Sequence, residues 1–69
     1  MKYYLITFKW PTDRLPCNLL INVSPATWVV DYQTRGMDLP PVLLFAIEIS
    51  KKDFDSCKDL HWVDNIEEV

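Results

Sequence analysis

The segment Val42–Ile49 is apolar at every position except Glu48, and this run limits the fold more than any other feature of the chain. Successive side chains of a strand point to opposite faces, so a strand formed here would be apolar on both faces. Strands of that kind are typically covered on both sides. The segment therefore predicts a central strand that is buried from both directions.

Covering such a strand is demanding for a chain of 69 residues. A domain of this size buries only about 60% of the surface that its unfolded chain exposes. Small domains compensate with a dense core, disulfides, a metal or a partner. Because 49% of the residues are hydrophobic and 13% are aromatic, the composition favours the dense core. We expect residues 1–69 to form a single small domain, since domains usually need on the order of 100 residues each.

Two further segments show the alternation of strands. Residues 2–10 place Tyr4, Ile6, Phe8 and Trp10 on one face, and residues 17–24 alternate apolar and polar positions with one exception. The six residues between them begin and end with proline, which stops both strands from running into the loop. A loop this short favours antiparallel pairing of the two strands.

Residues 24–36 are ambiguous between helix and strand. Ser24 suits a helix N-cap, Pro25 the first helical position and Gly36 the position after the last turn. The segment Thr27–Tyr32, however, is rich in the β-branched and aromatic residues that favour strands. We favour the helix, because its boundary signals agree with an apolar stripe that includes Trp28.

A second helix is expected over residues 51–60. Ser50 and Asp53 have the spacing of a capping box, and Phe54 and Cys57 lie on the face that the helix would bury. Residues 62–69 would continue this helix or form an acidic tail. The fold class that follows is α+β in the order β-β-α-β-α, with a short, mainly antiparallel sheet and one or two helices packed on one face.

The charge of the chain is uneven. The net charge is −3, and residues 53–69 hold six acidic side chains and one basic one. Nucleic-acid binding requires clustered Lys and Arg, so we expect no direct contact with nucleic acid. The acidic end fits a protein partner with a basic surface, although such ends are more commonly just solvated.

Few residues in the chain could carry catalysis or hold a metal. Cys57 and His61 would share one helix face, with Asp53 a turn earlier and Cys17 arriving from elsewhere. Zinc sites usually show paired, closely spaced Cys or His residues, and a thiolate nucleophile needs an oriented base and an oxyanion site. Neither pattern is present, so we expect no enzyme, no cofactor and no metal. A small metal- or thiol-dependent protein that uses Cys57 and His61 is the third hypothesis.

The sequence also bears on location. Its longest apolar stretch is far below the roughly 20 residues that span a bilayer, and the apolar run at residues 3–8 is too short for a signal peptide. We expect a cytoplasmic protein, with no membrane span and both cysteines reduced.

The large aromatic residues are more numerous than a thin core is expected to hide. Tyr, Trp and Arg are enriched at protein interfaces, so we expect a partner-binding patch that combines aromatic and acidic side chains. The predicted module is non-catalytic, an accessory subunit or an inhibitor of the type encoded by phages and mobile elements. The alternative is a homo-oligomer, such as a dimer, that buries its own sheet face or edge. The residues predicted for the patch are Tyr3, Trp10, Trp28, Tyr32, Arg35, Trp62, Asp64, Glu67 and Glu68.

Overall fold

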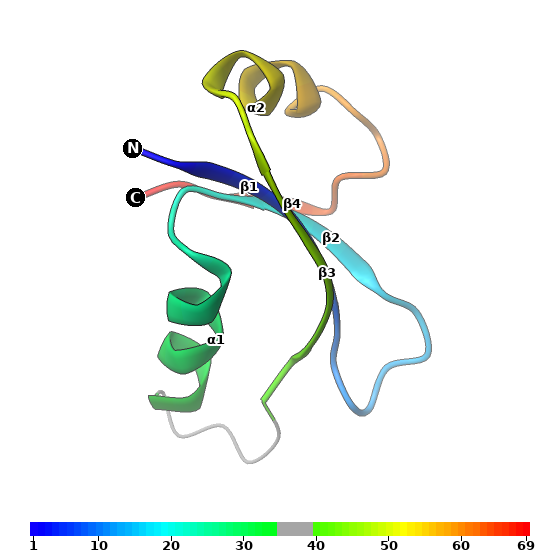
Figure 1. The fold of residues 1–69 in the computed structure, drawn as a ribbon. Helices are drawn as coiled ribbons and strands as arrows, with labels where there is room; N and C mark the ends of the chain where they lie inside the picture. Colours follow the sequence, from blue (N-terminus) through cyan, green and yellow to red (C-terminus); the bar gives the residue numbers. More distant parts are fainter. Residues whose placement is uncertain (35–39) are drawn as a thin grey trace.

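The computed structural model describes residues 1–34 and 40–69, of which residues 33 and 34 are described by their backbone alone. They form one sheet of four strands, against which two helices pack (Figure 1). The elements are β1 (Tyr3–Lys9), β2 (Cys17–Ile21), α1 (Pro25–Thr34), β3 (Val42–Ile49), α2 (Lys51–Cys57) and β4 (Asn65–Glu67).

The strands lie in the order β3-β1-β2-β4. β1 pairs antiparallel with both β2 and β3, whereas β2 and β4 run parallel. The expected α+β fold, with the order β-β-α-β-α and a mainly antiparallel sheet, is confirmed by these elements. β4 adds a short strand at the end of that order.

The ambiguous segment after β2 is a helix. The Ser24 side chain accepts a hydrogen bond from the Thr27 backbone N–H at 3.2 Å, and the Trp28 backbone N–H donates to the Ser24 carbonyl at 3.0 Å. The first bond satisfies a backbone N–H that the first turn of a helix leaves free, and the second is the first bond within the helix itself. The predicted stop signal, Gly36, lies outside the described residues.

The second helix begins where the sequence predicts and ends earlier. The Ser50 hydroxyl accepts a hydrogen bond from the Asp53 backbone N–H at 3.0 Å, as expected for an N-cap. α2 ends at Cys57 rather than near residue 60. Backbone N–H groups of Lys58 and Leu60 bond to carbonyls three residues earlier, so the chain tightens into turns there instead of continuing the helix.

The prediction that residues 42–49 form a central, covered strand is wrong in its position. The strand exists, but β3 is an edge strand, with β1 on one side. The central position was predicted because the segment is apolar on both faces. The spacing of apolar residues does not show which other strands pair with this one. Its most exposed apolar side chains keep about half of their surface in solvent: Val42 (50%), Leu44 (55%), Phe45 (53%) and Ile47 (46%).

The expectation of an acidic tail or a helix extension for residues 62–69 is also corrected. Asn65–Glu67 form β4, which pairs parallel with β2 through Leu19, Leu20 and Ile21. A strand of three residues is too short to show a period in the sequence. Its pairing depends on contacts with residues more than forty positions away, such as the Asp64 backbone N–H donating to the Asn18 carbonyl at 2.9 Å.

The two helices pack against opposite faces of the sheet, so the prediction that the helices share one face is wrong. The Trp28 ring of α1 lies 4.8 Å from the ring of Phe8, whereas the Phe54 ring of α2 lies 4.8 Å from the ring of Tyr3. Positions 3 and 8 of β1 alternate onto different faces. The α1 face carries the main core, made of Ile6, Phe8, Leu19, Ile21 and Trp28.

Candidate protein-interaction site

Three of the aromatic residues predicted for the patch are packed within the fold. The ring of Tyr32 lies 4.8 Å from that of Trp28 and 5.5 Å from that of Trp10, and Phe8 contacts both tryptophans. Trp28 is 4% exposed and Phe8 is also buried, whereas Trp10 and Tyr32 are half-buried. Aromatic rings at these centroid separations stabilise each other. This cluster thickens the small core and leaves little of Trp28 for a partner.

The other predicted aromatic residues do not join that cluster. Tyr3 packs on Phe54 at the opposite face of the sheet. Trp62 is 40% exposed and lies in the turn before β4, where its backbone carbonyl accepts a hydrogen bond from the Asn18 amide at 3.1 Å. Arg35 lies outside the described residues. The predicted residues therefore do not form one continuous surface in the part of the chain that the structure describes.

The acidic residues named for the patch hold the chain end in place. The Glu67 carboxylate accepts hydrogen bonds from Trp28 Nε1 at 2.7 Å and from the Tyr32 hydroxyl at 3.2 Å. Asp64 accepts from the Asn18 backbone N–H at 2.7 Å. Glu68 pairs with Lys58 at 3.1 Å, and this hydrogen bond raises the pKa of Lys58. Hydrogen bonds to charged groups are stronger than neutral ones, so these carboxylates stabilise β4.

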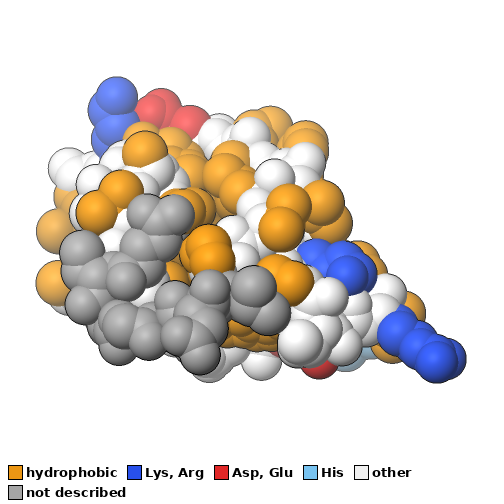
Figure 2. Space-filling model, turned by 90° about the horizontal axis from the view of Figure 1, so that it is seen from below, with side chains coloured by type: hydrophobic (Ala, Val, Ile, Leu, Met, Phe, Trp, Pro, Cys, Tyr) orange, Lys and Arg blue, Asp and Glu red, His pale blue; other side chains and the backbone are white. Residues whose placement is uncertain are grey.

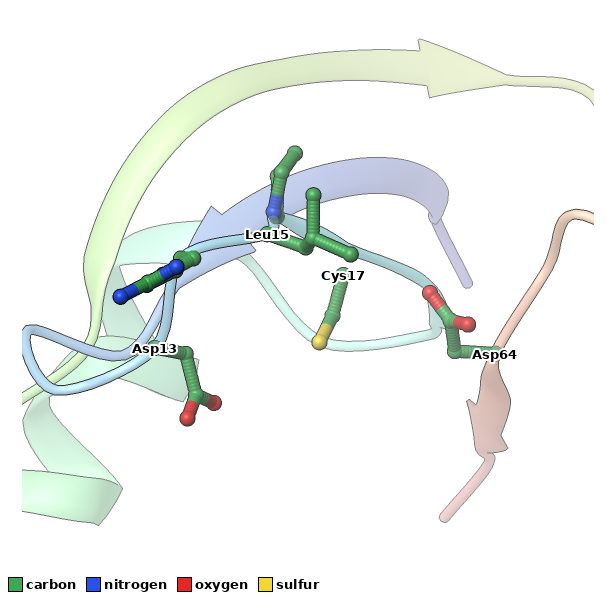
Figure 3. Close-up of a pocket in the computed structure, with 6 residues that line it drawn as sticks. Asp13, Leu15, Cys17 and Asp64 are labelled. Atoms are coloured by element: carbon green, nitrogen blue, oxygen red, sulfur yellow. The ribbon is translucent and has the colours of Figure 1, made fainter.

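An open pocket of about 410 Å³ lies between the β1–β2 loop and the start of β4. Figure 3 shows the Cys17 side chain in this pocket, between those of Asp13 and Asp64. Burial raises the pKa of the Cys17 thiol, and the carboxylates of Asp64 and Asp13 raise it further. Because the thiolate is the reactive form, this environment makes Cys17 a poor nucleophile.

Cys57 and His61 do not share a helix face. α2 ends at Cys57, and His61 is exposed in the following turn. Among residues 1–34 and 40–69, no group of three or more His, Cys, Asp or Glu side chains has the arrangement of a metal site. The i, i+4 geometry on which the thiol and zinc hypotheses depended is therefore not formed.

The exposed edge of β3 is the surface that sequence reasoning missed. Its backbone pairs with β1 on one side, and its half-exposed side chains Val42, Phe45 and Ile47 lie on one face of the sheet. Seen from below, the molecule carries hydrophobic side chains over much of that view, with Lys and Arg confined to small groups (Figure 2). Long apolar edge strands are templates for another strand. The unbroken apolar run was the available signal, but it was interpreted as burial.

Comparison with known proteins gives no match: no family model, curated protein or solved structure resembles this chain. None of the described helices is long and apolar enough to cross a membrane.

Proposed function

We propose that this protein is a non-catalytic protein-binding module and that the edge of β3 is its binding element. The observation that carries the proposal is an eight-residue edge strand with four apolar side chains about half exposed. Covering the exposed half of such a side chain contributes on the order of 1 kcal/mol. An added strand would also supply main-chain hydrogen bonds along the edge, which is a common mode of peptide recognition.

The acidic end of the chain is the second part of the proposal. Asp53, Asp55 and Asp59 are exposed on and after α2, and we assign them to a basic surface on a partner. Charges at the rim of an interface mainly speed association and select partners. An accessory subunit or an inhibitor of the phage or mobile-element type fits this arrangement. We place it in the cytoplasm, where both cysteines, which are free in the structure, would remain reduced.

The absence of a catalytic role is supported by the surroundings of the reactive side chains. Cys17 has a raised pKa beside two carboxylates, and His61 is exposed rather than oriented beside a thiol. The pocket at Cys17 is open to solvent, whereas catalytic groups usually work in sites that exclude water.

Binding experiments with two matched variants test the proposal. Phe45→Lys places a charge on the β3 edge, and Leu15→Lys places one on a more exposed apolar residue of the β1–β2 loop. We expect proteins retained from native extract by the wild-type chain to be lost with Phe45→Lys and kept with Leu15→Lys. Equal retention by all three chains would contradict the assignment of β3, and rising salt should weaken binding if the acidic end contributes.

A further inference from the structure

We propose that the strand which covers β3 is β3 of a second copy of this chain, paired antiparallel about a two-fold axis. The inference rests on the proposed function, because it names the partner of the same edge. The resulting dimer would have one continuous sheet of eight strands, with the two β3 strands at its centre and β4 at each outer edge. The central, covered position that the apolar sequence of β3 predicts would then exist in the dimer.

The first argument is the match of side chains across the axis. Phe45 and Ile47 lie opposite Thr7 and Leu5 in the ladder, so they share one face of the sheet. A two-fold axis perpendicular to the sheet keeps that face on the same side in both copies. The apolar strip of each copy therefore meets the equivalent strip of the other, and apolar cross-strand pairs are the main stabilising contacts between neighbouring strands.

The second argument is charge. A two-fold axis brings like side chains near each other, so a charged edge would repel its own copy. The sole charged residue of β3 is Glu48. Its carboxylate lies 3.6 Å from Nζ of Lys2, which precedes β1 in the same chain. The acidic residues of the segment 53–69 lie in two places. One group lies on and just after α2, and the other lies in and beside β4, at the edge of the sheet opposite β3. An acidic chain can therefore approach its copy through the β3 edge, which carries little charge.

The third argument is area. The exposed half of Phe45 offers on the order of 100 Å², given that an aromatic side chain buries about 150–250 Å², and the other three side chains offer less. Two copies would therefore cover at most roughly 800 Å² from these side chains, and the backbones of two eight-residue strands add to that. The contact would be small, near the lower end of stable interfaces, which begin near 1,200 Å².

The far edge explains why assembly stops at two copies. β4 has three residues, contains Glu67 and is followed by Glu68. Short, charged edges do not template further strands. An isologous contact between two identical edges closes on itself, so we expect a dimer rather than a fibre.

Analytical ultracentrifugation over a range from about 1 µM to 1 mM tests the inference, with the wild-type chain, Ile47→Lys and the control Leu15→Lys. We expect the wild type and the control to reach twice the monomer mass of 8.1 kDa. Ile47→Lys should dimerise at least tenfold more weakly, because a charge would then lie in the apolar contact between the two strands. Near-ultraviolet circular dichroism of the aromatic cluster shows whether each variant is folded.

Hydrogen exchange provides a measurement on the wild type that needs no variant. Amides of β3 should exchange at least tenfold more slowly at high protein concentration than at low concentration, while amides of α1 should not change.

A wild-type chain that stays monomeric, or a dimer unaffected by Ile47→Lys, would overturn the inference. If the monomer still captures another protein through Phe45, the proposed function survives without the dimer. If neither capture nor self-association depends on β3, both fail.

Discussion

The two edges of the sheet are built in opposite ways. β3 has eight residues and one charge, whereas β4 has three residues and is flanked on both sides by carboxylates. Exposed edges invite pairing with other chains unless shortness or charge protects them. β4 shows both kinds of protection, and β3 shows neither within its strand. This contrast is the basis of the proposed pairing through β3, although the register of β3 against β1 shifts once along the strand.

The protected edge depends on long-range polar contacts rather than on apolar burial. The Asn22 amide donates to the Val69 backbone oxygen at 3.0 Å, and its carbonyl accepts from the Val69 N–H at 2.8 Å. Glu67 adds the bonds to Trp28 and Tyr32. Ile66 is 37% exposed, so β4 contributes little to the core. Removing these polar contacts should therefore loosen β4 from β2 and leave this edge of the sheet unprotected.

Asn22→Ala should have the largest effect on this edge. Asn22 is buried, and the change removes both hydrogen bonds to Val69, which we expect to lower the free energy of unfolding by about 2 kcal/mol. Urea denaturation measures the loss. Asn65→Ala, at an exposed asparagine of β4 itself, is the control and should change stability by less than about 0.5 kcal/mol. Equal losses in the two variants would show that the Asn22 contacts are not what holds β4.

Glu67→Gln should have a smaller effect. The substitution keeps one oxygen that can accept from Trp28 or Tyr32 but removes the charge that strengthens both bonds. We expect a loss of about 1 kcal/mol, the difference between charged and neutral hydrogen bonds. Glu68→Gln is the matched control, because that carboxylate pairs with Lys58 in an exposed position and should matter less. If Glu68→Gln lowers stability as much as Glu67→Gln, the specific role of Glu67 is wrong.

Much of the fold follows from local sequence signals. The alternation around Phe8 predicts β1, and Ser50 with Asp53 predicts the start of α2, because both signals depend on neighbouring residues. The position of β3 at an edge could not be predicted, since it depends on which other strands pair with it. β4 could not be predicted either, because its three residues are fixed by the distant side chains of Asn18 and Asn22.

The candidate site was harder to predict than the fold. Trp and Tyr are typical both of interfaces and of dense cores, and their identity alone does not separate the two roles. Trp28 and Tyr32 contact each other and share the carboxylate of Glu67, a residue 35 or more positions away that the sequence assigned to a partner. The β3 edge was visible in the sequence as an apolar run, but its exposure is a property of the assembled sheet.

The smallest expected effect concerns the charge that β4 brings to Cys17. Asp64, just before β4, is one of two carboxylates that raise the pKa of the Cys17 thiol above its ordinary value of 9.0, after the effect of burial. Asp64→Asn removes this negative charge, so the thiolate should become easier to form and the pKa should fall. Because a weaker base is also a weaker nucleophile, alkylation near pH 8 should speed up only about two- to threefold.

The asparagine side chain can still accept from the Asn18 backbone N–H, so the start of β4 should keep its geometry. Cys57 serves as an internal reference for the reaction, since it is a second free cysteine in a different part of the fold. Mass spectrometry of partly alkylated protein, from pH 7 to 10, gives both rates at once. A Cys17 rate in Asp64→Asn that stays equal to or falls below the wild-type rate, with Cys57 unchanged, would show that the carboxylate does not act on the thiol through charge. An increase would show that the Asp64 carboxylate, which helps to hold β4, also lowers the reactivity of the Cys17 thiol.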